Sequence, residues 1–305
     1  MNCMKSFFRI IGMVTIIAAT AGCPDPDAGP GTKPGTAGAA PYRILAIGNS
    51  YSQDAMRYMR DILVKNGAAS GDIDIVNAYV GGQSLRGHAI AAQYDLASYD
   101  RESFGARGAI AKSSNNKLKD IIAGSEWDYI TLQQASADSG KPDTYQDDEI
   151  AYLLGFIKEH SANPAVKIGW HMTWAYAENY GDTAFDGYGR DQMAMYNAII
   201  QTVQAKILPN AEFDFIIPAG TAVQNARAVY GDILNSDGTH LNDRGRFIAG
   251  AMWLRQIYGF GVNVFDSPYQ ALNGTTVTLD DMAVIEQCVE DAFNAPFEAE
   301  GRQEQ

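Results

Sequence analysis

Apolar residues gather in five short runs along this chain. The runs span residues 43–47, 73–80, 128–132, 166–170 and 213–217. The first reads Arg43-Ile44-Leu45-Ala46-Ile47 and ends at Gly48. Short, nearly continuous apolar runs are typical of strands that are buried on both faces of a parallel sheet. The sequence therefore predicts five such strands.

Between these runs, apolar residues recur every three or four positions, as they do on one face of a helix. Helices are expected from Ser52, the predicted N-cap, to Gly67, and over 118–123, 150–157, 191–206 and 244–258. Strands that alternate with helices form a parallel sheet with helices on both faces. We therefore expect an α/β fold with three layers (α/β/α), flavodoxin-like, around a five-stranded parallel sheet.

Two short polar blocks stand where such a fold binds ligands. Right-handed crossovers bring the carboxyl ends of all parallel strands to one edge, and ligands bind there. Gly48-Asn49-Ser50-Tyr51 follows the first strand, and Asp237-Gly238-Thr239-His240 precedes the last long helix. A carboxylate three residues before a histidine can hold the imidazole in one tautomer. The alternative is that Ser50 and Asp237 only cap a helix or turn.

Taken together, the two blocks resemble those of the SGNH (GDSL-like) hydrolase superfamily. In that family Gly-Asp-Ser-Leu follows the first strand, and Asp-x-x-His completes a catalytic triad. Here Asn49 and Tyr51 stand in place of the Asp and the Leu, and the resemblance covers roughly residues 43–260. It implies that Ser50 is the nucleophile, His240 the base and Asp237 the residue that orients the base.

The resemblance also implies an oxyanion hole, which includes the backbone N–H groups of Ser50 and Gly82. The superfamily's Gly-x-Asn-Asp block, whose Asn side chain completes the hole, is missing, as in a divergent branch. Leu132-Gln133-Gln134-Ala135-Ser136 stands after the third strand instead. A glutamine amide donates the same kind of hydrogen bond as asparagine. We expect Gln133 to donate, with Gln134 as the alternative because neighbouring strand residues face opposite sides.

Three further residues follow the fourth strand at the same edge. Trp170 and Trp174 are candidates for stacking on a sugar ring, or else they pack in the core. His171 is expected to line the substrate pocket; it is also a weaker rival to His240, because no carboxylate lies near it in sequence. No group of His, Cys and Asp has metal-ligand spacing and no phosphate-binding glycine loop is present, so we expect neither metal nor cofactor.

The first residues read as a lipoprotein signal peptide, residues 1–22. Lys5 and Arg9 precede a short apolar stretch, and Thr20-Ala21-Gly22 lead to Cys23, which a lipobox would lipidate. An ordinary cleavable signal is the alternative. Residues 23–41 are rich in Pro and Gly and predict a flexible tether, and 42–305 predict one hydrolase domain. We expect an exported protein, anchored by lipid at the bacterial cell envelope, on its periplasmic face or the cell surface.

The formal net charge of -13 bears on the partners. A strongly acidic surface repels nucleic acid and anionic lipid headgroups, so we expect no nucleic acid and membrane contact only through the anchor. The predicted function is an esterase that removes O-acetyl or other small acyl groups from glycans, with simple carboxylesters or lipids as alternative substrates. A glycan-binding lipoprotein on a catalytically inactive hydrolase fold is the alternative from a different class.

Overall fold

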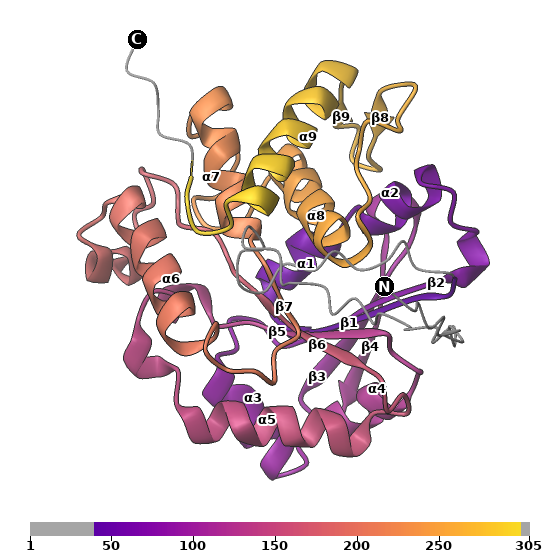
Figure 1. Cartoon of the computed structure of the whole chain (residues 1–305), viewed down its shortest axis with the longest axis vertical. Helices are drawn as coiled ribbons and strands as arrows, with labels where there is room; N and C mark the ends of the chain where they lie inside the picture. Colours follow the sequence, from indigo (N-terminus) through magenta and orange to yellow (C-terminus); the bar gives the residue numbers. More distant parts are fainter. Residues whose placement is uncertain (1–39, 300–305) are drawn as a thin grey trace, which may run out of the picture.

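The computed structural model describes residues 40–299. The predicted signal peptide, Cys23 and residues 23–39 of the predicted tether lie outside this range, as do residues 300–305. Helices and strands alternate along the described part of the chain (Figure 1). Among residues 40–299, no helix combines the length and the apolar character needed to cross a membrane.

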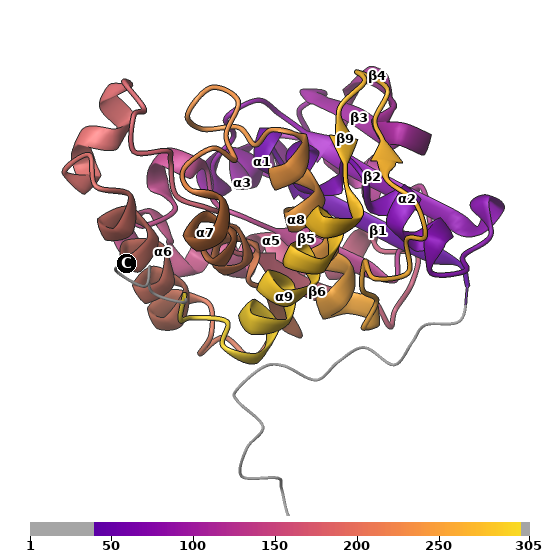
Figure 2. The ribbon, with the colours of Figure 1, turned by 90° about the horizontal axis from the view of Figure 1, so that it is seen from above.

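A seven-stranded sheet forms the middle layer of the molecule (Figure 1), and Figure 2 shows it from above with one layer of helices in front. Its spatial order is β4 (Ile110–Asn116), β3 (Tyr99–Phe104), β2 (Ile73–Tyr79), β1 (Tyr42–Gly48), β5 (Tyr129–Leu132), β6 (Lys167–His171) and β7 (Phe215–Ile217). The five strands from β2 to β7 in this order are parallel, whereas β3 and β4 pair antiparallel at one edge. Counted along the chain, the parallel strands have the flavodoxin-like order 2-1-3-4-5.

The five parallel strands coincide with the five apolar runs, so the predicted fold class is confirmed. The predicted strand count is too low because β3 and β4 were missed. Their sequences, YDRESF and IAKSSNN, are mostly polar, and most of β4 is exposed. An edge strand with exposed side chains needs no apolar run, so the pattern that marks buried parallel strands does not mark it.

Helices cover both faces of the sheet (Figure 1). One layer holds α1 (Ser50–Met56), α2 (Met59–Lys65), α7 (Ala219–Tyr230), α8 (Asp243–Tyr258) and α9 (Leu279–Asn294). The opposite layer holds α3 (Leu85–Gln93), α4 (Leu118–Ala123) and α5 (Asp147–His160), with α6 (Gln192–Lys206) beside them. Short 3-10 turns span Ser70–Asp72, Ala106–Gly108, Ser136–Asp138, Pro142–Thr144 and Thr183–Tyr188, and a ribbon of β8 (Tyr269–Gln270) and β9 (Thr276–Val277) leads into α9.

The first helix begins earlier than the sequence pattern predicts. Asn49, and not Ser52, is its N-cap, because Asn49 Oδ1 accepts a hydrogen bond from the Tyr51 N–H at 2.9 Å. The helix ends at Met56, and α2 starts after a break at Arg57 and Tyr58. Ser50 is thus the first residue of α1 and directly follows the end of β1.

Candidate active site

The carboxyl ends of the parallel strands bring most of the predicted site residues together. Ser50 follows β1, Gly82 follows β2, Gln133 follows β5, and His171 is the last residue of β6. The β1–β2 register pairs Gly48 with Tyr79, so the segments that continue from these two strands are neighbours. The same holds for β1 and β5. His240 reaches this edge from the loop before α8.

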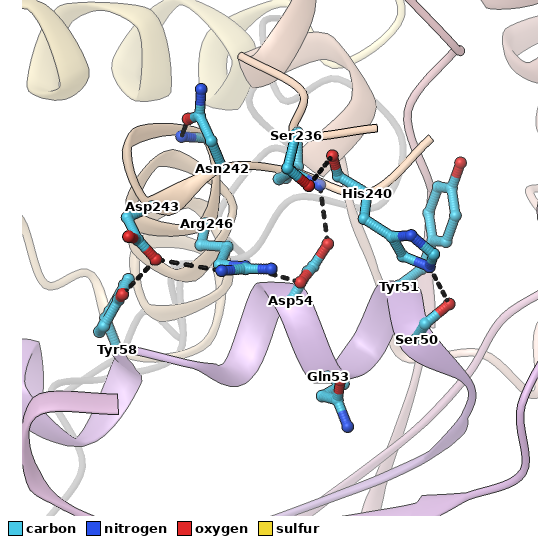
Figure 3. A network of polar contacts seen from close by, with 12 residues as sticks. Ser50, Tyr51, Gln53, Asp54, Tyr58, Ser236, His240, Asn242, Asp243 and Arg246 are labelled. Carbon is cyan, nitrogen blue, oxygen red and sulfur yellow. Dashed lines mark hydrogen bonds and ion pairs between the residues drawn. The ribbon is translucent and has the colours of Figure 1, made fainter. Parts of the chain in front are cut away.

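The side chains of Ser50, His240 and Asp237 form one chain of hydrogen bonds. Ser50 Oγ lies 2.8 Å from His240 Nε2 (Figure 3), and His240 Nδ1 lies 2.7 Å from Asp237 Oδ2. A carboxylate only accepts hydrogen bonds, so Nδ1 carries the proton and Nε2 is left to accept from the Ser50 hydroxyl. The His240 side chain is 35% exposed and that of Asp237 52%, so a substrate can reach both. A serine held in this way can give its proton to the imidazole.

Asp237 also shapes the loop that carries the histidine. Its Oδ1 accepts hydrogen bonds from the backbone N–H groups of Thr239 at 3.0 Å and His240 at 2.7 Å. Burial alone would raise the pKa of Asp237, but the hydrogen bonds from His240 and Thr239 hold its pKa below the usual range. Gly238 has a positive φ of 91°, and a Cβ there would lie 2.5 Å from the Tyr180 ring. Glycine therefore permits the turn that aims His240 at Ser50.

Asp54 in α1 contacts both this loop and Arg246 in α8 (Figure 3). Asp54 Oδ2 accepts a hydrogen bond from the Leu241 N–H at 2.8 Å, and its Oδ1 lies 2.7 Å from Arg246 Nε. Burial raises the pKa of Asp54, and the Arg246 guanidinium and the Leu241 N–H counteract it. Because Leu241 follows His240 directly, this contact fixes the loop relative to the helix that begins with Ser50.

Asp243 extends the ionic support at the start of α8. Its Oδ1 lies 3.1 Å from Arg246 Nη1 and accepts from the Tyr58 hydroxyl at 2.5 Å (Figure 3), while Oδ2 accepts from Asn273 Nδ2. Burial would raise the pKa of Asp243, but hydrogen bonds from Asn273, Tyr58, Thr275 and Arg246 bring it down to about 2. Asp243 is therefore ionised at neutral pH.

Tyr51 links the nucleophile segment to the histidine loop as well. Its hydroxyl lies 2.9 Å from Thr239 Oγ1, and its ring stacks on Trp174 with the centroids 4.3 Å apart. Trp174 Nε1 in turn donates to the Thr239 carbonyl at 3.0 Å. Tyr51 and Trp174 together hold Thr239, the residue before His240.

The prediction that Trp170 and Trp174 form a sugar-stacking platform is wrong. Trp174 is 0% exposed and packs against Tyr51. Trp170 is 1% exposed and contacts the rings of Tyr145 and Phe213. Both side chains belong to the hydrophobic core, so neither face is open to a sugar. Aromatic residues at the end of a buried strand favour packing unless a loop leaves a face uncovered.

His171 neither lines a pocket nor competes with His240 as a base. It is 1% exposed, and its Nδ1 lies 3.1 Å from Gln133 Oε1. Burial lowers the pKa of His171 to about 3, so the ring is neutral at physiological pH. The prediction of a substrate-binding role for His171 is therefore wrong, because the strand end on which it lies is covered.

Gln133 and Gln134 are also enclosed, at 1% exposure each. Gln133 Nε2 donates to Asn49 Oδ1 at 2.8 Å, and its Oε1 accepts from Ser52 Oγ. Gln134 Nε2 donates to the Thr144 carbonyl at 3.0 Å. An oxyanion donor must reach the substrate, so this placement contradicts the predicted role of Gln133 and does not favour Gln134 either.

Asn49 and Tyr51 are the functional residues whose roles the sequence reasoning missed. Asn49 accepts from Gln133, and its Nδ2 donates to the Gln83 carbonyl at 3.1 Å. Tyr51 bonds Thr239 as described above. Both positions depart from the Gly-Asp-Ser-Leu pattern, and each departure supplies a polar group that a neighbouring loop uses. The departures themselves were the available signal.

A polar cleft of about 280 Å³ lies beside Asp237. It is lined by Asn179, Tyr180, Asp232, Asn235, Ser236 and Asp237, among others. Hydroxyl, amide and carboxylate groups of this kind suit a ligand that carries several hydroxyl groups. Among residues 40–299, no group of three or more His, Cys, Asp and Glu side chains is arranged to hold a metal ion.

One family model matches residues 43–286, and its description reads "Domain of unknown function (DUF4886)". The crystal structure of a DUF4886 family protein from Bacteroides uniformis is 30% identical, with a TM-score of 0.75 over 85% of this chain and 97% of its own. No curated protein matches the chain.

Two further solved structures match the chain at lower identity and lower TM-score. A catalytic mutant of an acetylxylan esterase from Geobacillus stearothermophilus is 17% identical, with a TM-score of 0.43 over 72% of this chain and 96% of its own. A protein from Slackia heliotrinireducens, provisionally assigned to the SGNH hydrolases, is also 17% identical, with a TM-score of 0.43 over 70% and 98%.

Proposed function

The chain belongs to the DUF4886 family, and we propose that this member is a serine esterase that hydrolyses carboxylic esters through an acyl-enzyme. The observation that carries the proposal is the continuous chain of hydrogen bonds from Ser50 through His240 to Asp237. It combines a nucleophile, a base whose free nitrogen faces that nucleophile, and a carboxylate that fixes the tautomer of the base.

In this mechanism His240 Nε2 takes the Ser50 proton while Oγ attacks the ester carbonyl carbon. Asp237 stabilises the imidazolium that forms. The imidazolium then protonates the departing alcohol, which leaves Ser50 acylated. A water molecule, deprotonated by the same imidazole, attacks the acyl group and releases the carboxylic acid.

Backbone N–H groups of Ser50 and Gly82 are the proposed oxyanion donors. Within the described residues neither N–H donates to a protein acceptor. Gly82 has a positive φ of 64°, and no atom lies within 4 Å of the position a Cβ would take. A substrate carbonyl can therefore approach its backbone closely. A single oxyanion donor typically contributes ~10²–10³ in rate.

For the substrate, we propose small acyl groups, such as O-acetyl groups, on glycans. The polar cleft beside Asp237 supports this choice, because its amide, hydroxyl and carboxylate groups match a sugar better than a long acyl chain. Export and a lipid anchor at Cys23 complete the proposal. Expression with a labelled fatty acid tests the anchor, and a label that survives Cys23→Ala would refute it.

The test of the function compares wild type with Ser50→Ala on p-nitrophenyl acetate. We expect the variant to lose at least ~10³-fold in kcat/KM, because the nucleophile is gone. Equal rates would refute the nucleophile assignment. Acetate release from acetylated polysaccharides, measured beside p-nitrophenyl esters of increasing chain length, then tests the substrate. The glycan proposal fails if only the free esters are cleaved, and glycan binding without turnover would point to a binding protein.

A further inference from the structure

A buried chain of hydrogen bonds runs from the end of β6 to the loop after β2, and it passes through the residue before Ser50. His171 Nδ1 lies 3.1 Å from Gln133 Oε1, Gln133 Nε2 lies 2.8 Å from Asn49 Oδ1, and Asn49 Nδ2 lies 3.1 Å from the Gln83 carbonyl. His171, Gln133 and Asn49 are each 1% exposed. We call these three side chains the amide relay.

Backbone groups at one end fix the direction of the amide relay. The Tyr51 N–H can only donate, and it points at Asn49 Oδ1, whereas the Gln83 carbonyl can only accept. Asn49 therefore turns its oxygen to Tyr51 and its nitrogen to Gln83. Gln133 must then present its N–H to Asn49 Oδ1, and its own oxygen faces His171. Each side chain in the amide relay donates toward Gln83.

The other end of the relay keeps this direction. Burial lowers the pKa of His171 to about 3, so its ring holds one proton, which lies on Nδ1 because Gln133 Oε1 accepts it. Ser52 Oγ donates to the same oxygen. Two donors on the Gln133 carbonyl polarise the amide and strengthen the bond that its N–H gives to Asn49.

On the basis of the proposed esterase function, we propose that the amide relay positions the oxyanion loop. The Asn49–Gln83 bond holds the turn that carries Gly82 against the Ser50 segment, so that the Gly82 and Ser50 N–H groups converge on one point. His171, Gln133 and Asn49 are thus positioning residues, which act through the backbone. In the superfamily that the sequence resembles, an Asn side chain reaches the oxyanion itself; here Gln133 braces the backbone donors from behind.

This role explains why Asn replaces Asp at position 49. A carboxylate there would place a second acceptor oxygen against the Gln83 carbonyl and a negative charge in a fully buried site. The Asn49–Gln83 bond would be replaced by a repulsion. A glutamate at position 133 would likewise face Asn49 Oδ1 with an oxygen. Each change keeps the size and shape of the side chain but replaces an N–H donor with an acceptor oxygen.

The experiment compares Asn49→Asp and Gln133→Glu with the matched control Gln134→Glu. The control makes the same change one residue away, at a buried amide whose nitrogen donates to Thr144 and not to the amide relay. A glutamate there keeps an oxygen that can accept from the Leu85 N–H, as Gln134 Oε1 does. With p-nitrophenyl acetate we expect each relay variant to lose ~10–10² in kcat with KM changed by less than ~3-fold, because the oxyanion forms only in the transition state. Affinity for a boronic acid that mimics the tetrahedral state should fall in parallel.

Hydrogen exchange of residues 79–84 completes the test, with thermal unfolding of each whole variant to check that it folds. Because the Asn49–Gln83 bond holds this turn, we expect faster exchange in this segment for Asn49→Asp than for Gln134→Glu, whether or not the protein is an esterase. If Ser50→Ala is as active as wild type but the exchange differs as expected, the assignment of Ser50 as nucleophile fails and the loop contact stands. The proposal is overturned if both glutamate variants lose kcat equally, or if Asn49→Asp keeps wild-type kcat and exchange.

Discussion

The two halves of the candidate site are built from different chemistry. The Ser50 half is held by the amide relay, whose side chains are neutral and almost fully buried. The His240 half is the loop with Asp237 and His240, and its supports are Asp54, Asp243 and Arg246, which are charged. The side chains of Asp237 and His240 are also partly exposed, unlike those of the amide relay.

The difference follows from what each half does in the proposed reaction. A loop that aims backbone N–H groups needs fixed geometry, and buried amides supply it because each donor has one acceptor. The histidine becomes charged during the reaction, and nearby carboxylates compensate that charge. We therefore expect changes in the His240 half to act through charge and changes in the Ser50 half to act through geometry.

The largest effect is expected for Asp237→Asn in the His240 half. An asparagine nitrogen that faces Nδ1 would favour the tautomer with the proton on Nε2, which cannot accept the Ser50 proton. We expect kcat to fall by ~10⁴-fold with a small change in KM, measured on p-nitrophenyl acetate. The control Asp266→Asn removes an exposed carboxylate that pairs with Lys65 and should keep wild-type activity.

The loss of kcat in Asp237→Asn can also be compared with the loss in the relay variants. We expect Asp237→Asn to lose at least ~10-fold more in kcat than either relay variant. The reason is that Asp237→Asn disables the base, whereas each relay variant weakens only an oxyanion donor. A loss of less than ~10-fold for Asp237→Asn would mean that Asp237 only shapes the loop through its bonds to the Thr239 and His240 N–H groups.

A second prediction concerns the pH dependence of stability. Burial lowers the pKa of His171 to about 3, whereas an exposed histidine titrates near ~6.5. Between these values the unfolded chain binds a proton that the folded protein excludes, so the free energy of unfolding falls as the pH falls. We expect His171→Gln to reduce this slope by up to ~1.4 kcal/mol per pH unit between about pH 6 and pH 4, in urea unfolding experiments.

The His240 half should respond in a different pH window. Because the pKa of Asp243 is lowered to about 2, its contribution to stability is present above about pH 4 and is lost as the pH falls through about 2. Asp243→Asn should therefore change the slope only below about pH 4. His88→Gln, at a second buried histidine whose pKa is lowered to about 3, should act like His171→Gln. If neither histidine variant changes the slope of the free energy of unfolding with pH, the lowered pKa values of His171 and His88 are wrong.

The sequence was sufficient for the parts of the fold that bury continuous apolar runs. All five parallel strands followed from such runs, and their order placed Ser50 at the edge that His240 reaches. The strands β3 and β4 did not, because their side chains are polar and partly exposed. Apolar runs in the sequence therefore predict only the strands whose side chains are buried.

The same limit applies to the candidate site. The spacing of Asp237 and His240 is local, so the contact between them could be anticipated within one turn. Exposure at a strand end depends on which loops cover it, and Trp170, Trp174 and Gln133 were misjudged for that reason. Residue type and strand position alone do not reveal whether a side chain is open to substrate or enclosed.

The smallest effect is expected for Tyr51→Phe, the contact that bridges the two halves. The change removes the hydroxyl that bonds Thr239 Oγ1 but keeps the ring that stacks on Trp174. We expect a loss of ~1 kcal/mol in the free energy of unfolding and ~2–10-fold in kcat, because Trp174 Nε1 still holds the Thr239 carbonyl. Thr239→Val removes the other partner of the bond, so the double variant should cost little more than either single one. Fully additive losses in kcat would show that the two hydroxyl groups act separately. Tyr51 would then help to link the two halves only through the stacking of its ring on Trp174, which bonds the Thr239 carbonyl.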